Sequence, residues 1–117
     1  MASQQSIVDF ILEQAAGAGL LRARKMFGEY AIYRNDQMIA LVCQDRLYLK
    51  PTDAVRQWLT APVEGAPYPK ARPHLLIGAE FWEDREYMAS LFVLTDENLP
   101  PPAPKKPRRS ARVKKSA

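Results

Sequence analysis

Few residues of this chain have side chains suited to catalysis, and they are scattered. The sequence holds one histidine, His74, and one cysteine, Cys43. A thiol and an imidazole act as a nucleophilic pair only when they are in contact, and nothing in the spacing places these two together. Cys43 lies in an apolar run typical of a buried, unreactive thiol, and His74 follows a proline, which favours a hydrogen-bonding role in a loop. We therefore assign no catalytic residue and expect no enzymatic activity.

Metal and cofactor sites have no clear sequence signature either. A single cysteine excludes an internal disulfide and argues against the usual Cys/His metal clusters. Met26-Phe27-Gly28 lacks the further glycines and the Lys-Ser/Thr of a phosphate-binding loop, so Gly28 is interpreted as a strand glycine at a bulge or a close backbone contact. Four carboxylates crowd the start of the last expected helix, where they complement its dipole: Glu80, Glu83, Asp84 and Glu86. We expect no metal and no cofactor.

The strongest chemical signal is a run of cations near the C-terminus. All 13 acidic residues precede position 100, whereas seven of the 17 Lys and Arg residues follow it, giving a body of charge −3 and a tail of +7. Such a tail favours phosphate backbones as partners, through counterion release; a passive solubilising tail is the alternative. No aromatic residue interleaves the cations, so stacking on single-stranded bases is not expected. The predicted nucleic-acid contacts are Lys105, Lys106, Arg108, Arg109, Arg112, Lys114 and Lys115.

The central part of the expected fold is residues 25–50, whose pattern predicts an antiparallel meander of three strands. We expect strands at 27–33, 38–43 and 47–50, with chain reversals at Asn35-Asp36 and at 44–46. Period-2 alternation puts Leu47 and Leu49 on a buried face and Tyr48 and Lys50 on the other. Short connections exclude a parallel sheet. The fold class is therefore α+β, with one face of the sheet covered by the flanking segments.

Three helices are expected around the meander. The first starts at Ser6 or Ser3, ends at Gly17 and Gly19, and has an apolar face made of Ile7, Phe10, Ile11, Gln14 and Ala15. The second starts at Thr52 or Asp53 and has an apolar face made of Val55, Trp58 and Leu59, which predicts that the Trp58 ring is buried on the sheet. The third starts at Asp84 and has Tyr87, Met88, Leu91, Phe92 and Thr95 at helical spacing.

The remaining segments are an extended proline-rich loop, a short strand and a tail. Residues 63–74 hold too many prolines for a regular helix, and residues 75–77 predict a strand that ends at Gly78. From Leu99 onward, proline and like charges leave too little apolar surface to offset the entropy of ordering. We therefore expect one domain over residues 1–98 and a disordered tail over residues 99–117.

A weaker set of residues could form a ligand or partner surface: Arg24, Lys25, Lys50, Tyr68 and His74. Arg22, Arg24 and Lys25 are also explained as a solvated strand edge that discourages aggregation. Lys50, after Tyr48, is the body lysine that we favour for a ligand contact, although an ordinary outward-facing lysine explains it too. Tyr68 and His74 would serve a small-ligand sensor or enzyme that uses the proline-rich loop.

Several stretches together resemble a known family. They are Lys25-Met26-Phe27-Gly28, Tyr30, Tyr33, Leu41-Val42, Leu47–Lys50, Glu64–Pro69 and Arg72-Pro73-His74. Over roughly residues 10–94 the chain resembles the N-terminal domain of the TfoX/Sxy family, regulators first associated with natural competence. The resemblance implies a two-layer α+β domain with helices on one side of an antiparallel sheet, and a regulatory or interaction role without an established reaction.

The chain has one large departure from that family. Members often carry a second glycine where Glu29 stands, but short members also have Glu there. Full-length members carry a second, helical domain, which is replaced here by the basic tail, so a role in competence or transcription does not follow directly. The function expected is thus a small regulatory or interaction module, and the alternatives are a non-specific nucleic-acid-binding accessory protein and a small-ligand sensor or enzyme.

The sequence also gives expectations about the cellular compartment of the protein and about its partners. No run reaches the roughly 18 apolar residues of a membrane span, and the start of the chain lacks the features of a signal peptide, so we expect a cytoplasmic protein that does not enter membranes. The expected partner is another protein, with DNA or RNA contacted non-specifically through the tail. A homodimer is also compatible with the sequence.

Overall fold

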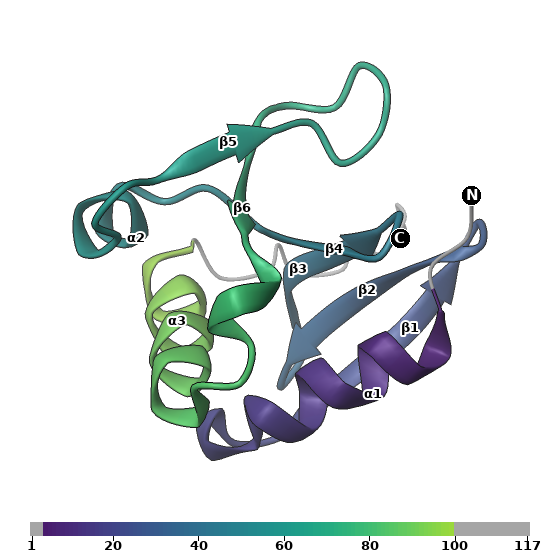
Figure 1. The fold of residues 1–117 in the computed structure, drawn as a ribbon, viewed down its shortest axis with the longest axis horizontal. Coiled ribbons are helices and arrows are strands. Elements are labelled where there is room, and N and C mark those ends of the chain that lie inside the picture. Colours follow the sequence, from purple (N-terminus) through teal and green to yellow (C-terminus); the bar gives the residue numbers. More distant parts are fainter. Residues whose placement is uncertain (1–3, 100–117) are drawn as a thin grey trace, which may run out of the picture.

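A six-stranded antiparallel sheet forms the centre of the molecule, in the order β1-β2-β3-β4-β6-β5 (Figure 1). The computed structural model describes residues 4–99, so the seven tail cations predicted to bind nucleic acid lie outside the described residues. The strands are β1 (Leu21–Met26), β2 (Glu29–Arg34), β3 (Gln37–Cys43), β4 (Arg46–Leu49), β5 (Val63–Gly65) and β6 (His74–Ile77). The helices are α1 (Gln5–Gln14), α2 (Asp53–Trp58) and α3 (Arg85–Asn98), with short 3₁₀ turns η1 (Ala16–Ala18) and η2 (Ala79–Phe81). The predicted α+β class and antiparallel sheet are confirmed.

The sheet begins one strand earlier than the sequence suggested. Residues 27–33 were expected to form the first strand, but Phe27 and Gly28 form a tight turn between β1 and β2. Both have positive φ, 51° and 82°, the requirement of a type I′ hairpin turn. The interpretation of Gly28 as a bulge glycine was therefore wrong. Phenylalanine hides this turn from sequence analysis because it is untypical of a left-handed position.

The bulge lies elsewhere, in β3. Ile32 pairs with Ala40 and Tyr33 pairs with Met38, which leaves Ile39 as an extra residue. Ile39 and Ala40 both belong to the buried cluster under the helices. The bulge thus lets two neighbouring residues enter the same core.

Two of the three helices differ from their predicted form. α1 starts after Gln4 without a side-chain cap, so Ser6 does not cap it, and Ser3 lies outside the described residues. Its buried side is made of Val8, Ile11, Gln14 and the following Ala15, whereas Ile7 is half-buried and Phe10 is exposed. The buried face is therefore rotated relative to the predicted one, with Val8 inside in place of Ile7 and Phe10.

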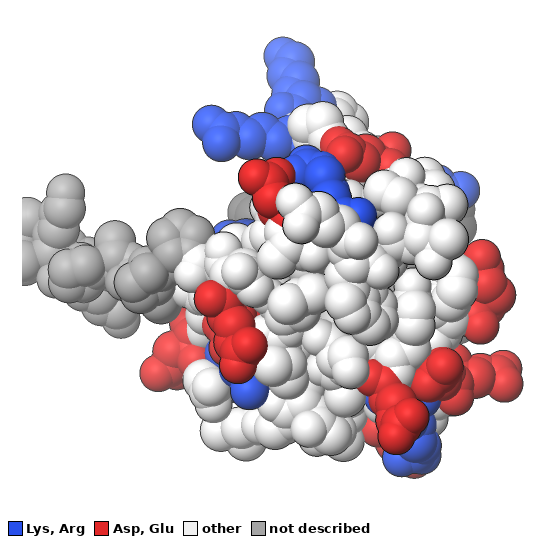
Figure 2. Space-filling view, turned by 90° about the vertical axis from the view of Figure 1, so that its left-hand side faces the viewer, with Lys and Arg blue, Asp and Glu red and all other residues white. Residues whose placement is uncertain are grey.

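The second helix starts as predicted but leaves its tryptophan outside. Thr52 Oγ1 accepts a hydrogen bond from the Val55 amide at 3.2 Å. Trp58 is 43% exposed, and its ring lies 5.0 Å from that of Tyr87 rather than under the sheet. The expected burial of Trp58 was therefore wrong. The side of the molecule formed by α2 and α3 is mostly uncharged, with both acidic and basic side chains around its margins (Figure 2).

The last helix and the last strand agree with the sequence. Asp84 Oδ1 accepts from the Tyr87 amide at 3.0 Å and caps α3. Met88, Leu91, Phe92 and Thr95 are buried, and β6 covers the predicted strand. The segment expected to be a loop holds one more strand, β5, which pairs with β6 at the end of the sheet. Leu99, predicted as the first tail residue, instead packs half-buried against the core.

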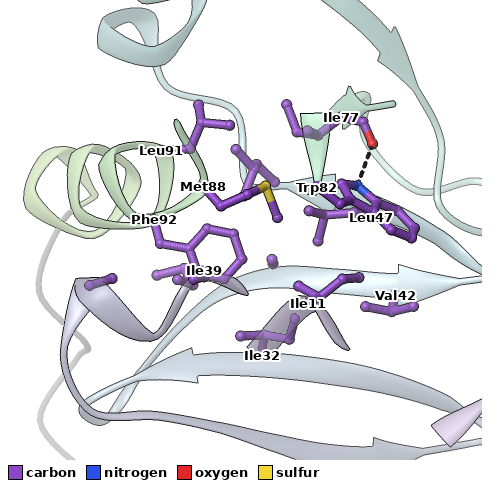
Figure 3. Close-up of a cluster of buried hydrophobic side chains, with 14 of the residues drawn as sticks. Ile11, Ile32, Ile39, Val42, Leu47, Ile77, Trp82, Met88, Leu91 and Phe92 are labelled. Atoms are coloured by element: carbon purple, nitrogen blue, oxygen red, sulfur yellow. Dashed lines mark hydrogen bonds between the residues drawn. The ribbon is translucent and has the colours of Figure 1, made fainter. Parts of the chain in front are cut away.

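The main core lies between the sheet and the helices (Figure 3). Its buried polar groups have partners: Trp82 Nε1 donates to the Ile77 carbonyl at 3.1 Å, and Gln14 Nε2 donates to the Trp82 carbonyl at 2.9 Å. The side chains at its centre are Ile11, Ile32, Ile39, Val42, Leu47, Ile77, Trp82, Met88, Leu91 and Phe92. None of the helices within residues 4–99 has the length and apolar character that spanning a bilayer requires.

Candidate functional site: a cleft on the second face of the sheet

The second face of the sheet carries its own buried cluster. Ala31, Leu41, Cys43 and Tyr48 are at most 7% exposed. The buried apolar residues of α1, α2 and α3 belong to the other cluster, so none of the helices within residues 4–99 covers this one. The sequence predicted one buried face, and Tyr48 on the opposite face was expected to be outside; its burial corrects that expectation.

The loop between β5 and β6 covers part of this face. It leaves β5 at Gly65, where a Cβ atom would lie 3.6 Å from Cε1 of the Tyr48 ring. Pro67 is buried. The prolines keep the segment extended without helix, and this lets it run over the sheet instead of packing as a separate element.

A cleft of about 520 Å³ lies between this loop and the β1–β2 turn. Met26 and Phe27 line it from the turn, and Pro67–Pro69 line it from the loop. Leu41 and Cys43 line it from β3. The cleft is therefore mostly apolar, and it is built by segments far apart in the sequence.

Phe27 is the most unusual residue of the cleft. Its side chain is fully exposed, and its backbone has a φ of 51°. An L-residue other than Gly, Asn or Asp rarely takes this conformation. The ring thus gains no burial in the folded domain that would offset the backbone cost.

Two polar side chains of the cleft, Glu29 and Tyr30, already have hydrogen-bond partners. Glu29 Oε1 accepts from the Gln44 amide at 3.2 Å, and the Tyr30 hydroxyl donates to Gln5 Oε1 at 2.9 Å. Burial, and secondarily the charge of Glu29, raises the pKa of the Cys43 thiol from 9.0 to about 11. The thiol is therefore protonated at neutral pH and is a poor nucleophile. This arrangement suits recognition of apolar shape better than covalent chemistry.

The structure brings only one of the predicted surface residues to the cleft. Tyr68 lines it and is 55% exposed. His74 begins β6, where its Nδ1 lies 2.8 Å from the Arg72 carbonyl. Cys43 pairs with Arg46 at one end of β4, whereas the β6 segment next to His74 pairs with the other end. The Cys43–His74 pair considered in the sequence is thus not formed.

The other predicted residues lie apart from the cleft. Arg24 and Lys25 are exposed on β1, at the edge of the sheet. Lys50 is half-buried after β4, and its backbone amide donates to the Ile39 carbonyl at 2.9 Å. Sequence reasoning missed Met26, Phe27 and Leu41 as site residues. The only signal was the Met-Phe-Gly motif, which was assigned a structural role.

Metal binding has no support in the described part of the chain. Within residues 4–99, no three His, Cys, Asp or Glu residues lie close enough to hold an ion together. Of the four carboxylates expected at the start of α3, Asp84 caps the helix and Glu86 lies in its first turn, whereas Glu80 belongs to η2.

Comparison with known proteins places the chain in a family. Residues 13–98 match the family described as the TfoX N-terminal domain. A protein of Spirochaeta aurantia, described as an uncharacterized 12.7 kDa protein in the trpE 5′ region, is 35% identical over 106 residues, which cover 91% of each chain. The family match agrees with the resemblance drawn from the motifs. The chain belongs to the TfoX N-terminal domain family.

Proposed function

We propose that this domain is a non-enzymatic interaction module of a regulatory kind, which holds an apolar side chain of a partner protein in the cleft beside Phe27. The observation that carries this proposal is the fully exposed Phe27 ring on a left-handed backbone. That conformation costs about 1–2 kcal/mol for an L-residue. Asn would avoid most of the cost, so a partner contact is the reason we give for phenylalanine.

The shape and lining of the cleft support a partner with a large apolar anchor. Exposed aromatic rings beside a desolvated pocket are typical of residues that dominate binding energy. Phe27 lines the cleft from the β1–β2 turn, Tyr68 lines it from the loop before β6, and Leu41 lines it from β3. A partner side chain seated there would cover both rings and bury apolar surface that is now exposed. A link to transcriptional regulation or competence is part of the same proposal and is supported by family membership alone.

A small ligand is the second candidate for this cleft. Its volume lies within the range of about 300–1,000 Å³ found for ligand sites, and Tyr68 belongs to it as the ligand-sensor alternative expects. Against this, Glu29 Oε1 already accepts from the backbone amide of Gln44, so this carboxylate is less available to orient a ligand. The protein-anchor proposal is therefore preferred.

Site-specific photo-crosslinking in the native cell tests the proposal. A photoreactive phenylalanine analogue at position 68 should crosslink to a partner protein, and the adduct should disappear when Phe27→Asn is added. The matched control is Leu20→Ser, which changes an exposed apolar residue that does not line the cleft. The same analogue at exposed Phe10 on α1 reports non-specific contacts.

Two results would contradict the protein-anchor proposal. The first is an adduct at position 68 that persists unchanged with Phe27→Asn. The second is a small molecule, detected by native mass spectrometry of the purified protein, that is lost with Phe27→Asn while no protein adduct forms. That second result would favour the small-ligand sensor.

A further inference from the structure

The outer edge of β1 is long and open. β1 ends the sheet, and among residues 4–99 no strand pairs with its outer side. All six of its residues pair with β2 in one continuous register, so no bulge interrupts it. β5, at the other end of the sheet, has only three residues and follows Pro62. The edge at β5 is thus short, whereas the edge at β1 is regular along its length.

The register identifies which backbone groups face outward. In antiparallel pairs, residues bonded to the partner strand alternate with residues whose N–H and C=O point away from it. Met26 pairs with Glu29 across the two-residue turn, so the backbone N–H and C=O of Met26 point toward β2. The carbonyl of Leu20, six residues earlier, accepts from the Asn35 amide at 3.0 Å, so Leu20 also faces β2, as every second residue between them does. Leu21, Ala23 and Lys25 therefore direct their backbone groups toward the open edge.

The charged residues of β1 are all positive. Arg22 and Arg24 lie on the same sheet face as Met26, and Lys25 lies on the helix side. The Arg22 guanidinium lies 4.5 Å from the centre of the Tyr33 ring and 4.0 Å from the exposed Asp36 carboxylate. Arg24 and Lys25 form no ion pair with any residue that the structure describes. β1 thus combines free backbone positions with two cations, Arg24 and Lys25, that have no acidic partner among the described residues.

We propose that β1 accepts an extended acidic segment of a partner protein as an additional strand of the sheet. The backbone of that segment would bond to Leu21, Ala23 and Lys25, as in β-strand addition. Its carboxylates, at alternate positions, would lie opposite Arg22 and Arg24, at the spacing of cross-strand pairs. This inference goes beyond the cleft, because it uses different residues and a different kind of contact.

A second copy of the chain fits this edge poorly. Two β1 strands paired antiparallel about Ala23 would place Arg22 opposite Arg24. Pairing about Lys25 would place the two Lys25 side chains opposite each other. Like charges at these positions are destabilising, so charge favours an acidic partner over self-association. A purely protective edge, charged to prevent pairing, is the remaining alternative and is decided by the test.

Fluorescence anisotropy with synthetic strand peptides tests the proposal on the full-length chain. The probe is a labelled peptide of alternating Glu and Thr residues; the comparison peptides carry Lys in place of Glu, or N-methyl groups on alternate backbone nitrogens. The Glu peptide should bind, and either change should weaken binding about tenfold or more. Hydrogen exchange at the Leu21, Ala23 and Lys25 amides should slow when the Glu peptide is added.

Charge variants separate the edge from the basic tail. Arg22→Glu with Arg24→Glu should reverse the preference toward the Lys peptide. Lys70→Glu with Arg72→Glu makes the same change in net charge at exposed loop positions and should leave the preference unchanged. Because both double variants retain the tail, binding of a peptide to the tail contributes equally to the two measurements.

Backbone and cleft variants complete the test. Ala23→Pro should abolish binding, because it removes an outward N–H without breaking the β1–β2 ladder. Phe27→Asn should leave binding unchanged, so failure of the cleft proposal does not affect this one. Equal binding of the N-methylated peptide, or equal effects of the two double charge variants, would overturn strand addition and leave β1 as a protective edge.

Discussion

Phe27 combines an unfavourable backbone conformation with a fully exposed side chain. Its φ of 51° is followed by 82° at Gly28, and two-residue turns of this kind favour Asn-Gly. Since the Phe27 side chain is fully exposed, replacing it removes little packing from the folded domain. Replacing Phe27 by Asn should therefore increase the stability of the domain and weaken the binding of a partner in the cleft.

Phe27→Asn should raise the free energy of unfolding by about 1 kcal/mol, because Asn tolerates positive φ better than Phe does. Urea unfolding followed by circular dichroism measures the change. Leu20→Ser, at another exposed apolar residue, should alter stability by less than about 0.5 kcal/mol. A loss of stability with Phe27→Asn would show that the ring packs on the domain.

The Cys43 thiol should make stability depend on pH in the alkaline range. Its pKa is raised from 9.0 to about 11 in the folded domain, by burial and by the charge of Glu29. Its contribution is full below about pH 9 and is lost between about pH 9 and 11, because the unfolded state releases the proton first. The loss should reach about 2 kcal/mol.

Cys43→Ala isolates this effect from other alkaline titrations. The difference in unfolding free energy between the parent protein and the variant should be constant below about pH 9 and should shrink above it. Parallel pH profiles for the two proteins would mean that the thiol titrates equally in both states.

At the scale of elements, one polar cluster joins the C-terminal end of α3 to the β2–β3 turn. Arg34 forms a part-buried ion pair with Asp96 and donates from Nε to the Ala18 carbonyl at 2.8 Å. Gln37 Nε2 donates to Asp96 Oδ1 at 2.9 Å. A single carboxylate of α3 thus holds two residues of the sheet, and Arg34 also reaches the turn after α1.

Asp96→Ala should lower stability by about 2 kcal/mol, since it leaves part-buried donors of Arg34 and Gln37 without their acceptor. Chemical denaturation gives the value. The control is Asp36→Ala, whose carboxylate is 98% exposed and lies 4.0 Å from Arg22; it should cost less than about 0.5 kcal/mol. Equal losses of unfolding free energy for the two variants would show that this cluster does not stabilise the fold more than an exposed ion pair does.

Trp58→Ala should cost only about 1 kcal/mol, less than the roughly 3–5 kcal/mol typical of a buried aromatic residue. The ring is 43% exposed and contacts Tyr87, which in turn stacks on Phe81 at 4.8 Å. Thermal unfolding of the variant beside Phe92→Ala, a fully buried position, makes the comparison. A loss as large as that of Phe92→Ala would show that Trp58 is part of the core.

At the scale of the whole molecule, charge divides the chain into two parts. The residues before position 100 carry a charge of −3, and those after it carry +7. The tail lies outside the described residues, so its proposed contact with nucleic acid rests on its composition. An acidic body should contribute little to DNA binding, and a charge-only contact should be indifferent to base sequence.

Deleting residues 100–117 should therefore abolish any binding of duplex DNA. The full chain should bind weakly, with a log–log salt slope that approaches but does not exceed about −6, the limit for seven charges. A DNA titration at several salt concentrations with both chains measures this. If the shortened chain retains the affinity, a folded surface such as Arg22, Arg24 and Lys25 is responsible; if neither chain binds, the nucleic-acid proposal fails.

The sequence alone determined the features that depend on near neighbours. Alternation along 47–49 and the caps at Thr52 and Asp84 express contacts within a few residues. These were predicted because backbone geometry and capping are local. Starts of elements were less certain, and the first strand and the first helix were misplaced for that reason.

Only the tertiary structure decided how distant segments meet. It placed the end of β5 at Gly65 against the Tyr48 ring, opened the cleft between Pro67–Pro69 and Phe27, and left Trp58 on the surface. A helical or strand period shows which residues share a face, but whether a face is covered depends on segments elsewhere in the chain. The proposed site is made of such contacts, because its walls come from β1, β3 and the loop before β6, and no local pattern records that they are adjacent.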